Sequence, residues 1–239
     1  MVKHVVWVAL ILAACTKQDS DNILTRGMYA SMTAAAHGDG STDVSATLYL
    51  EDPIQLDFIE LQGDDRLVAW QGTSSRIMSE SDFLNIVSYH ASFDVDAEGT
   101  EFRVQFERSV DDGAPDSHGT LPSPFELSTL PAEMSSRAQD LTVTWDPYGP
   151  SDPMSWELEG DDCIQRASGA IPVDTGALTI LANTIMKKMQ QDGQPPVPDT
   201  CAATLTIRRS RAGEVDPAFE EGGTFTGVQV RLATFQTVP

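Results

Sequence analysis

Apolar and polar residues alternate along most of this chain, with the period of two that is typical of a strand with one buried face. The clearest run covers residues 101–107, where Phe102, Val104 and Phe106 share one side and Glu, Arg and Gln residues share the other. Further alternating runs cover residues 44–50, 86–93, 141–145, 154–158 and 201–208. Because a sheet with one wet face is usually antiparallel, the pattern predicts antiparallel sheets.

Clusters of Gly, Asp and Pro separate these runs and can reverse the chain within a few residues. They lie at residues 63–65, 111–113, 147–150 and 160–162. Short strands at this spacing predict an all-β fold made of one or more antiparallel β-sandwiches. We expect it to be immunoglobulin-like in architecture only. Antibody domains place a core tryptophan between two bridging cysteines, whereas Trp145 and Trp156 both precede Cys163.

One stretch interrupts the strand pattern. Residues 183–191 predict a short helix, with Asn183 as its cap and with Ile185, Met186 and Met189 on one side. Gly193 then ends the predicted helix.

The chain also contains a candidate domain boundary. Residues 110–123 are rich in Asp, Gly, Pro and Ser and have little to bury. We therefore expect an N-terminal β domain at 25–110 and a C-terminal β-sandwich domain at 124–239. One large sandwich remains open as an alternative, since all-β domains reach this size.

The N-terminus carries an export pattern. Lys3 lies in a short basic start, residues 5–14 are uncharged and apolar, and Leu12, Ala13 and Ala14 precede Cys15. The apolar run is too short to span a bilayer as a permanent helix. The motif resembles the lipobox of bacterial lipoproteins, whose cysteine receives a diacylglycerol and becomes the new N-terminus. An ordinary secretory signal with a chance cysteine is the alternative.

The resemblance implies a signal peptide at 1–14 and a lipidated tether at 15–24 that begins at Cys15. With its strand-rich body, the chain resembles the envelope lipoproteins with β-sandwich bodies that Gram-negative bacteria export. Thr16 follows Cys15. In the sorting rule of enteric bacteria, Asp at that position retains a lipoprotein at the inner membrane, so we expect the outer membrane.

Setting Cys15 aside leaves Cys163 and Cys201 as the thiols of an exported chain. We expect them to form a disulfide, because the compartment is oxidising and neither lies in a Cys-x-x-Cys pattern or beside a histidine. Closing a loop of about 39 residues would stabilise the fold by about 4 kcal/mol.

The formal net charge of the chain is −21 at pH 7. Nucleic acid and anionic lipid head groups carry the same sign, so the charge argues against both as partners. We expect no nucleic acid partner.

No motif for chemistry is present. The serine hydrolase elbow, the phosphate-binding loop and the zinc protease motif are all missing from the sequence. His118 and Asp116 could form a hydrolase pair only if a serine came from elsewhere, and His90 is expected on the exposed face of a strand. We nominate no catalytic residues and expect no cofactor.

Three acidic residues are weak calcium candidates. Asp94, Asp96 and Glu98 alternate before Gly99, as in part of an EF-hand loop. The flanking helices are missing, and Gln105 stands where the twelfth-position acid belongs, so we commit to no metal site.

Aromatic residues are the second clue to ligands, because an exposed ring can stack on a sugar or a peptide. Trp70, Trp145 and Trp156 fall in strand runs, which favours core positions. Tyr148 lies among Pro and Gly residues and is expected at a loop tip.

The leading hypothesis is a non-catalytic, membrane-anchored envelope lipoprotein with a structural, protein-binding or glycan-binding role. Its partners would be the lipid bilayer, through Cys15, and an envelope protein or glycan. The alternatives are a hydrolase of envelope or extracellular polymers and a calcium-dependent adhesion module.

Overall fold

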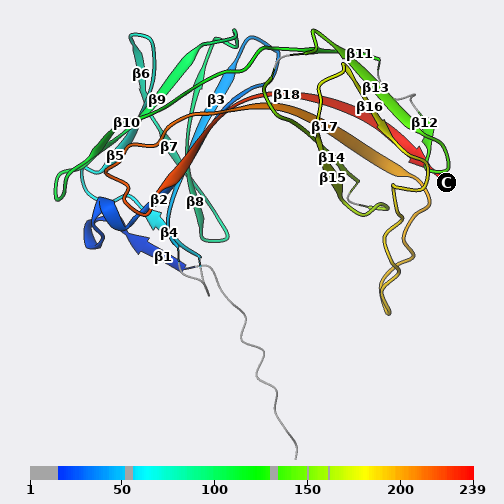
Figure 1. The fold of residues 1–239 in the computed structure, drawn as a ribbon. Coiled ribbons are helices and arrows are strands. Elements are labelled where there is room, and N and C mark those ends of the chain that lie inside the picture. The colour runs from blue at the N-terminus through cyan, green and yellow to red at the C-terminus, as the bar shows by residue number, and fades with distance from the viewer. Residues whose placement is uncertain (1–15, 52–55, 130–133, 150, 161) are drawn as a thin grey trace, which may run out of the picture.

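The computed structural model describes residues 16–51, 56–129, 134–149, 151–160 and 162–239 (Figure 1). These residues form an all-β sandwich fold, as predicted. The only helices among them are two short 3-10 turns, η1 (Ser20–Asn22) and η2 (Thr25–Gly27). No helix in this part of the chain is both long and apolar enough to cross a membrane.

The largest sheet has eleven strands. Its main path runs through β1 (Thr16–Asp19), β4 (Leu56–Glu60), β3 (Thr42–Glu51), β2 (Tyr29–Ala36), β18 (Gly223–Val238), β17 (Cys201–Ala212), β14 (Met154–Glu159) and β15 (Ala167–Ile171). Three further strands pair with this path: β8 (Ile86–Phe93) on β3, β7 (Ser79–Phe83) on β8, and β12 (Met134–Ser136) on β18. Most pairs are antiparallel, but β1–β4, β2–β18 and β12–β18 are parallel.

Two smaller sheets complete the fold. One contains β10 (Ala114–Thr120), β9 (Glu101–Glu107), β5 (Arg66–Gln71) and β6 (Ser74–Ile77). The other contains β11 (Glu126–Thr129), β13 (Leu141–Asp146) and β16 (Ala177–Ile180). Both pack on the same face of the large sheet. The odd-numbered residues of β18 share that face, and Phe225 lies in the first core while Phe235 lies in the second.

Each small sheet closes its own hydrophobic core. The first core includes Phe102, Val104 and Phe106 of β9, and the second includes Trp145 of β13. The hairpin of β17 and β18 reaches both cores, and Figure 1 shows it as a curved ribbon that runs from one to the other. The two halves of the molecule are therefore joined by a continuous sheet.

Most of the predicted strands are confirmed. β9 has the bounds of the predicted run at 101–107, and its Phe and Val residues are buried. In β8, Val87 and Phe93 are buried while His90 is exposed, as the alternation predicts. The register of β9 against β5 then places the charged side of β9 on the outer surface of the small sheet.

The predicted helix at 183–191 is wrong. Asn183 has a φ of 65°, and the residues after it form no helix. The segment is held in an extended form because Lys188 N–H donates to the Cys163 carbonyl and Gln165 N–H donates to the Met186 carbonyl. Met189 is 81% exposed, so the methionines cover no core here.

The stretch expected to separate two domains, residues 110–123, holds a strand of the first core. β10 pairs with β9, and Ala114, Ser117 and Leu121 are fully buried. On the other side of the expected boundary, Phe219 and Phe225 belong to the first core although they lie within 124–239. Turn-forming residues dominate the composition here, and of the few apolar ones the fold buries Ala114 and Leu121 but leaves Val110 exposed.

The predicted disulfide is confirmed. Cys163 and Cys201 are bonded, with their Cα atoms 5.8 Å apart. Both lie in the second core, where the bond closes the chain between β14 and the start of β17.

Candidate functional site

The outer face of the small sheet β10-β9-β5-β6 carries the candidate site. Along β5, Leu67 and Ala69 face the first core, so Trp70 points to the outer face. Trp70 is paired in register with Arg103 of β9, and Arg103 is paired with His118 of β10. Three neighbouring strands therefore present an aromatic and two basic side chains side by side.

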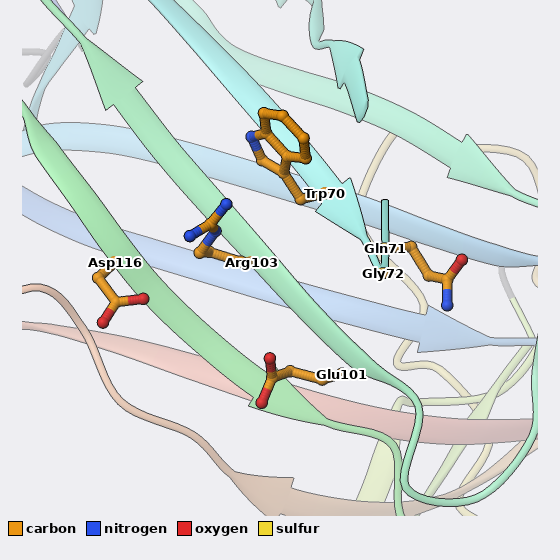
Figure 2. A pocket seen from close by; sticks show the side chains of 6 residues that line it. All are labelled: Trp70, Gln71, Gly72, Glu101, Arg103 and Asp116. Atoms are coloured by element: carbon orange, nitrogen blue, oxygen red, sulfur yellow. The ribbon is translucent and has the colours of Figure 1, made fainter. Parts of the chain in front are cut away.

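A pocket of about 380 Å³ lies on this face. Figure 2 shows the six residues that line it, which come from three strands and from the turn after β5. They are Trp70, Gln71, Gly72, Glu101, Arg103 and Asp116. Gly72 has a φ of 56°, a conformation that L side chains rarely adopt, and it ends β5 at the rim of the pocket.

The Arg103 guanidinium lies over the indole ring of Trp70, with its central carbon 5.3 Å from the ring centroid. This contact fixes both side chains through a cation–π interaction. Trp70 Nε1 is buried and has no hydrogen-bond partner among the residues that the structure describes. Buried donors without a partner are exceptions in folded proteins, so the indole N–H of Trp70 is a hydrogen-bond donor that the fold leaves unused.

The charges of the pocket are mixed. Glu101 and Asp116 are exposed carboxylates that line it together with Arg103. His118 lies next to Asp116, with its Nδ1 3.1 Å from the Asp116 carbonyl oxygen. That hydrogen bond, together with the nearby carboxylates of Asp116, Glu101 and Glu214, outweighs partial burial and raises the pKa of His118 above its usual value.

This arrangement is suited to binding a polar ligand that has a flat apolar side. An indole ring supplies a stacking surface, and carboxylate, guanidinium and amide groups around it supply hydrogen bonds in both directions. Sugars combine apolar ring faces with hydroxyl groups that both donate and accept, so they match this set.

A second polar cluster, the central seam, lies between the two cores. It consists of Arg209 of β17, Gln229 and Arg231 of β18, and the segment 121–126 that passes over them. Arg209 is fully buried and donates to the Ser123 and Pro147 carbonyls and to Asp174 Oδ2. The seam has no free surface at Arg209, so we assign it to the fold.

Asp174 is the charged partner of Arg209. Burial raises the pKa of its carboxyl, but hydrogen bonds from Gly176 N–H, Trp145 Nε1 and Arg209 outweigh that effect and hold the pKa below its usual range. The carboxylate is 2.6 Å from an Arg209 nitrogen, with both side chains almost completely buried.

The calcium candidates are not brought together. Asp94 faces Arg76 at 3.8 Å, Asp96 Oδ2 accepts from the Gly40 N–H, and Glu98 lies 3.9 Å from Arg211. In the described ranges no group of three or more His, Cys, Asp or Glu residues is placed to hold a metal ion. Cys15, the predicted lipidation site, lies outside the described residues.

The tryptophans divide between core and surface. Trp145 lies in the second core and Tyr148 is exposed at its turn, as predicted. The core position predicted for Trp70 is wrong, because its side chain is on the outer face and lines the pocket. The parity of the strand could have shown this, since Trp70 falls on the opposite side from Leu67 and Ala69.

No family model and no curated protein matches the chain. Among solved structures, it aligns with the Ig1–Ig3 ectodomain of mouse nectin-like molecule 4 at 11% identity and a TM-score of 0.28, covering 89% of this chain and 64% of that one. It also aligns with titin domains I67–I69 at 9% identity, covering 85% and 62% with a TM-score of 0.24. A third alignment, with the Bacteroides ovatus SGBP-B in complex with a mixed-linkage heptasaccharide, has 10% identity, covers 98% and 69%, and has a TM-score of 0.21. These scores are too low to carry an argument about function, and the chain spans 64% of the nectin-like ectodomain's length.

Proposed function

We propose that this protein is a non-catalytic, lipid-anchored lipoprotein of the cell envelope that binds a glycan at the Trp70 pocket. The observation that carries the binding role is the outward-facing Trp70 ring, held by Arg103 and bordered by two carboxylates and an amide in a pocket of about 380 Å³. A core tryptophan would be covered on both faces, whereas this one lines a pocket on the surface.

The charges favour a neutral glycan over an acidic one. Two of the lining residues, Glu101 and Asp116, are carboxylates, and one, Arg103, is a cation that already lies over the indole ring. The whole chain has a net charge of −21, so an anionic polymer would be repelled at long range as well. Neutral sugar hydroxyls can donate to the carboxylates and accept from the guanidinium.

The anchor in this proposal comes from the N-terminal motif. Residues 12–15 resemble a lipobox, and the chain that follows begins its first described strand at Thr16. Two or three acyl chains on Cys15 would hold a soluble body on a membrane for long periods, because each buried methylene contributes about 0.8 kcal/mol. The outer membrane is the proposed location.

The glycan role is tested with a panel of soluble neutral polysaccharides in affinity gels, followed by calorimetry on any that retard the protein. For a retarding polymer, Trp70→Ala should weaken binding about tenfold or more, as expected for an aromatic hot spot. Tyr148→Ala is the matched control, since Tyr148 is an exposed aromatic residue outside the pocket. Equal losses in the two variants, or retardation by none of the panel, would contradict the proposal.

The non-catalytic and anchoring parts need separate measurements. Release of new reducing ends from a bound polymer would favour the hydrolase alternative. Metabolic labelling with a fatty-acid probe should mark the wild-type protein and leave Cys15→Ala unmarked. An unmarked wild-type protein would remove the anchor from the proposal and leave the glycan site standing.

A further inference from the structure

The hairpin of β7 and β8 ends in an exposed apolar turn. Phe83 and Leu84 are 71% and 75% exposed, and Ile86 is 43% exposed. We call residues 83–86, which include Asn85, the apolar tip. Leu84 and Asn85 have φ values of 52° and 65°, so they form a tight two-residue turn with both residues in the left-handed region. The tip carries no charged side chain.

The tip is held on a firm base. β7 and β8 pair without a break from Phe83 and Ile86 back to Ser79 and His90. Near that base the Tyr89 hydroxyl accepts a hydrogen bond from the Leu61 N–H at 2.8 Å and donates one to Glu80 Oε2 at 3.2 Å. The ordered hairpin therefore presents the apolar side chains of the tip to solvent.

The apolar tip lies beside the start of the described chain. Lys17 Nζ is 2.9 Å from Asp82 Oδ2 and 3.1 Å from Glu60 Oε2, and Asp82 directly precedes Phe83. Lys17 is two residues after Cys15. Because consecutive Cα atoms are about 3.8 Å apart, the Cα of the predicted lipid attachment point lies within about 8 Å of the Lys17 Cα. Figure 1 shows β1 and the turn between β7 and β8 at the same end of the molecule.

The Trp70 pocket lies at the other end of the first core. Gly72 and Glu101, which line it, stand in the turn between β5 and β6 and at the start of β9. In Figure 1 that turn lies at the far end of the small sheet from β1. The apolar tip and the pocket thus mark opposite ends of one sandwich.

We propose that the apolar tip inserts into the interface of the bilayer that holds the acyl chains of Cys15, which makes it a second membrane contact and points the Trp70 pocket away from the membrane. This inference rests on the lipid anchor of the proposed function. Phe and Leu side chains on an ordered support are suited to the boundary between head groups and acyl chains. The pairing of Asp82 and Glu60 with Lys17 reduces the negative charge next to the tip.

A bilayer fits the tip better than a second copy of the chain. A dimer through this end would bring together two bodies that each have a net charge of −21, and the tip is only a two-residue turn with its flanking residues. The neighbouring lipid anchor, in contrast, keeps the tip at the membrane surface at a high effective concentration.

The test uses the lipidated full-length protein in phosphatidylcholine vesicles, with an environment-sensitive NBD label on Leu84→Cys. The label reaches the introduced thiol alone, because Cys163 and Cys201 are bonded to each other and Cys15 carries the lipid. Val173→Cys is the matched control, since Val173 is 69% exposed and lies near the second core. We expect the emission at position 84 to shift to shorter wavelength and to be quenched by lipids with a bromine or nitroxide near the head group. The label at position 173 should show neither change.

The outcomes separate this inference from the anchor. If the protein floats with the vesicles but the label at 84 behaves like that at 173, the tip does not insert and the inference is overturned while the anchor stands. If the wild-type protein does not float and takes up no fatty-acid probe, both fail. A second labelled variant, Phe83→Cys, should reproduce the result at 84, and a water-like signal there would also overturn the inference.

Discussion

Two of the arginines that stack on an aromatic ring, Arg209 in the central seam and Arg103 in the pocket, differ in what surrounds them. In the central seam the Arg209 guanidinium lies 5.0 Å from the Phe125 ring centroid, and in the pocket Arg103 lies 5.3 Å from that of Trp70. Arg209 and Phe125 are buried, and carbonyl and carboxylate oxygens of the chain occupy the two terminal nitrogens of Arg209. Arg103 and Trp70 lie on the surface among exposed carboxylates.

The difference shows that a stack of arginine on an aromatic ring can either hold the fold together or form a surface for a ligand. Where the chain itself supplies the hydrogen-bond acceptors, the stack fastens the segment 121–126 to β17 and β18. Where it leaves the polar groups facing solvent, the stack forms a rigid surface that a ligand can use. The same substitution should therefore change stability at one stack and binding at the other.

The largest effect is expected at the buried stack. Arg209→Met removes one member of a buried ion pair and leaves the Asp174 carboxylate without its charged partner. Such losses destabilise a fold by about 3–5 kcal/mol. Urea unfolding of the wild type and the variant measures the difference. If Arg209→Met and Arg103→Met lowered the free energy of unfolding equally, the buried stack would contribute no more to stability than the exposed one.

A smaller loss is expected at the ring of the same stack. Phe125 is buried, and both Arg209 and Arg231 lie over it. Phe125→Leu keeps an apolar side chain but removes both cation–π contacts and leaves a small cavity, so we expect destabilisation by about 1–3 kcal/mol. The measurement is again the free energy of unfolding. An unchanged value would mean that the two arginines do not depend on the ring.

At the exposed stack we expect a change in binding rather than in stability. Arg103→Met should alter the free energy of unfolding by less than about 1 kcal/mol, because the pair is on the surface. Affinity for a glycan that the pocket binds should fall about tenfold, as the guanidinium positions the ring and donates hydrogen bonds. A large loss of stability with unchanged affinity would reverse the roles of the two stacks.

The smallest effect concerns pH. The pKa of His118 is raised in the folded protein, so its contribution to stability is complete below its unfolded pKa of about 6.5 and is lost as pH rises through the folded pKa. Between about pH 6 and pH 8 the wild type should therefore lose slightly more stability than His118→Gln. Unfolding curves across this range test it. Parallel pH profiles for the two proteins would contradict the shift.

The strands could be predicted because burial on one face imposes a period of two, and β9 shows it without interruption. The central seam could not be predicted this way. Arg209 and Arg231 stand at positions that face the core, and an arginine there looks like a break in the apolar pattern. Only the folded chain shows that Asp174, from the loop between β15 and β16, and Glu126, from β11, meet them.

The helix at 183–191 was mispredicted for a related reason. Its spacing is compatible with one apolar face, but the Cys163–Cys201 bond and the backbone hydrogen bonds to residues 163 and 165 decide its conformation.

The pocket could be predicted from the sequence only in part. The outward parity of Trp70 can be read from the sequence, whereas the meeting of Asp116 with Trp70 depends on the register of β10 against β9.

The parallel pairing of β2 with β18 has a consequence for how the protein matures. Residues 30–36 pair with residues 223–229, which are synthesised 193 positions later (223 − 30 = 193). The first sandwich therefore cannot complete its sheet on a nascent chain until residue 229 has been made. For a polypeptide that is threaded through a secretion channel in an unfolded form, such a delay leaves residues 30–36 without this neighbouring strand until residues 223–229 have crossed.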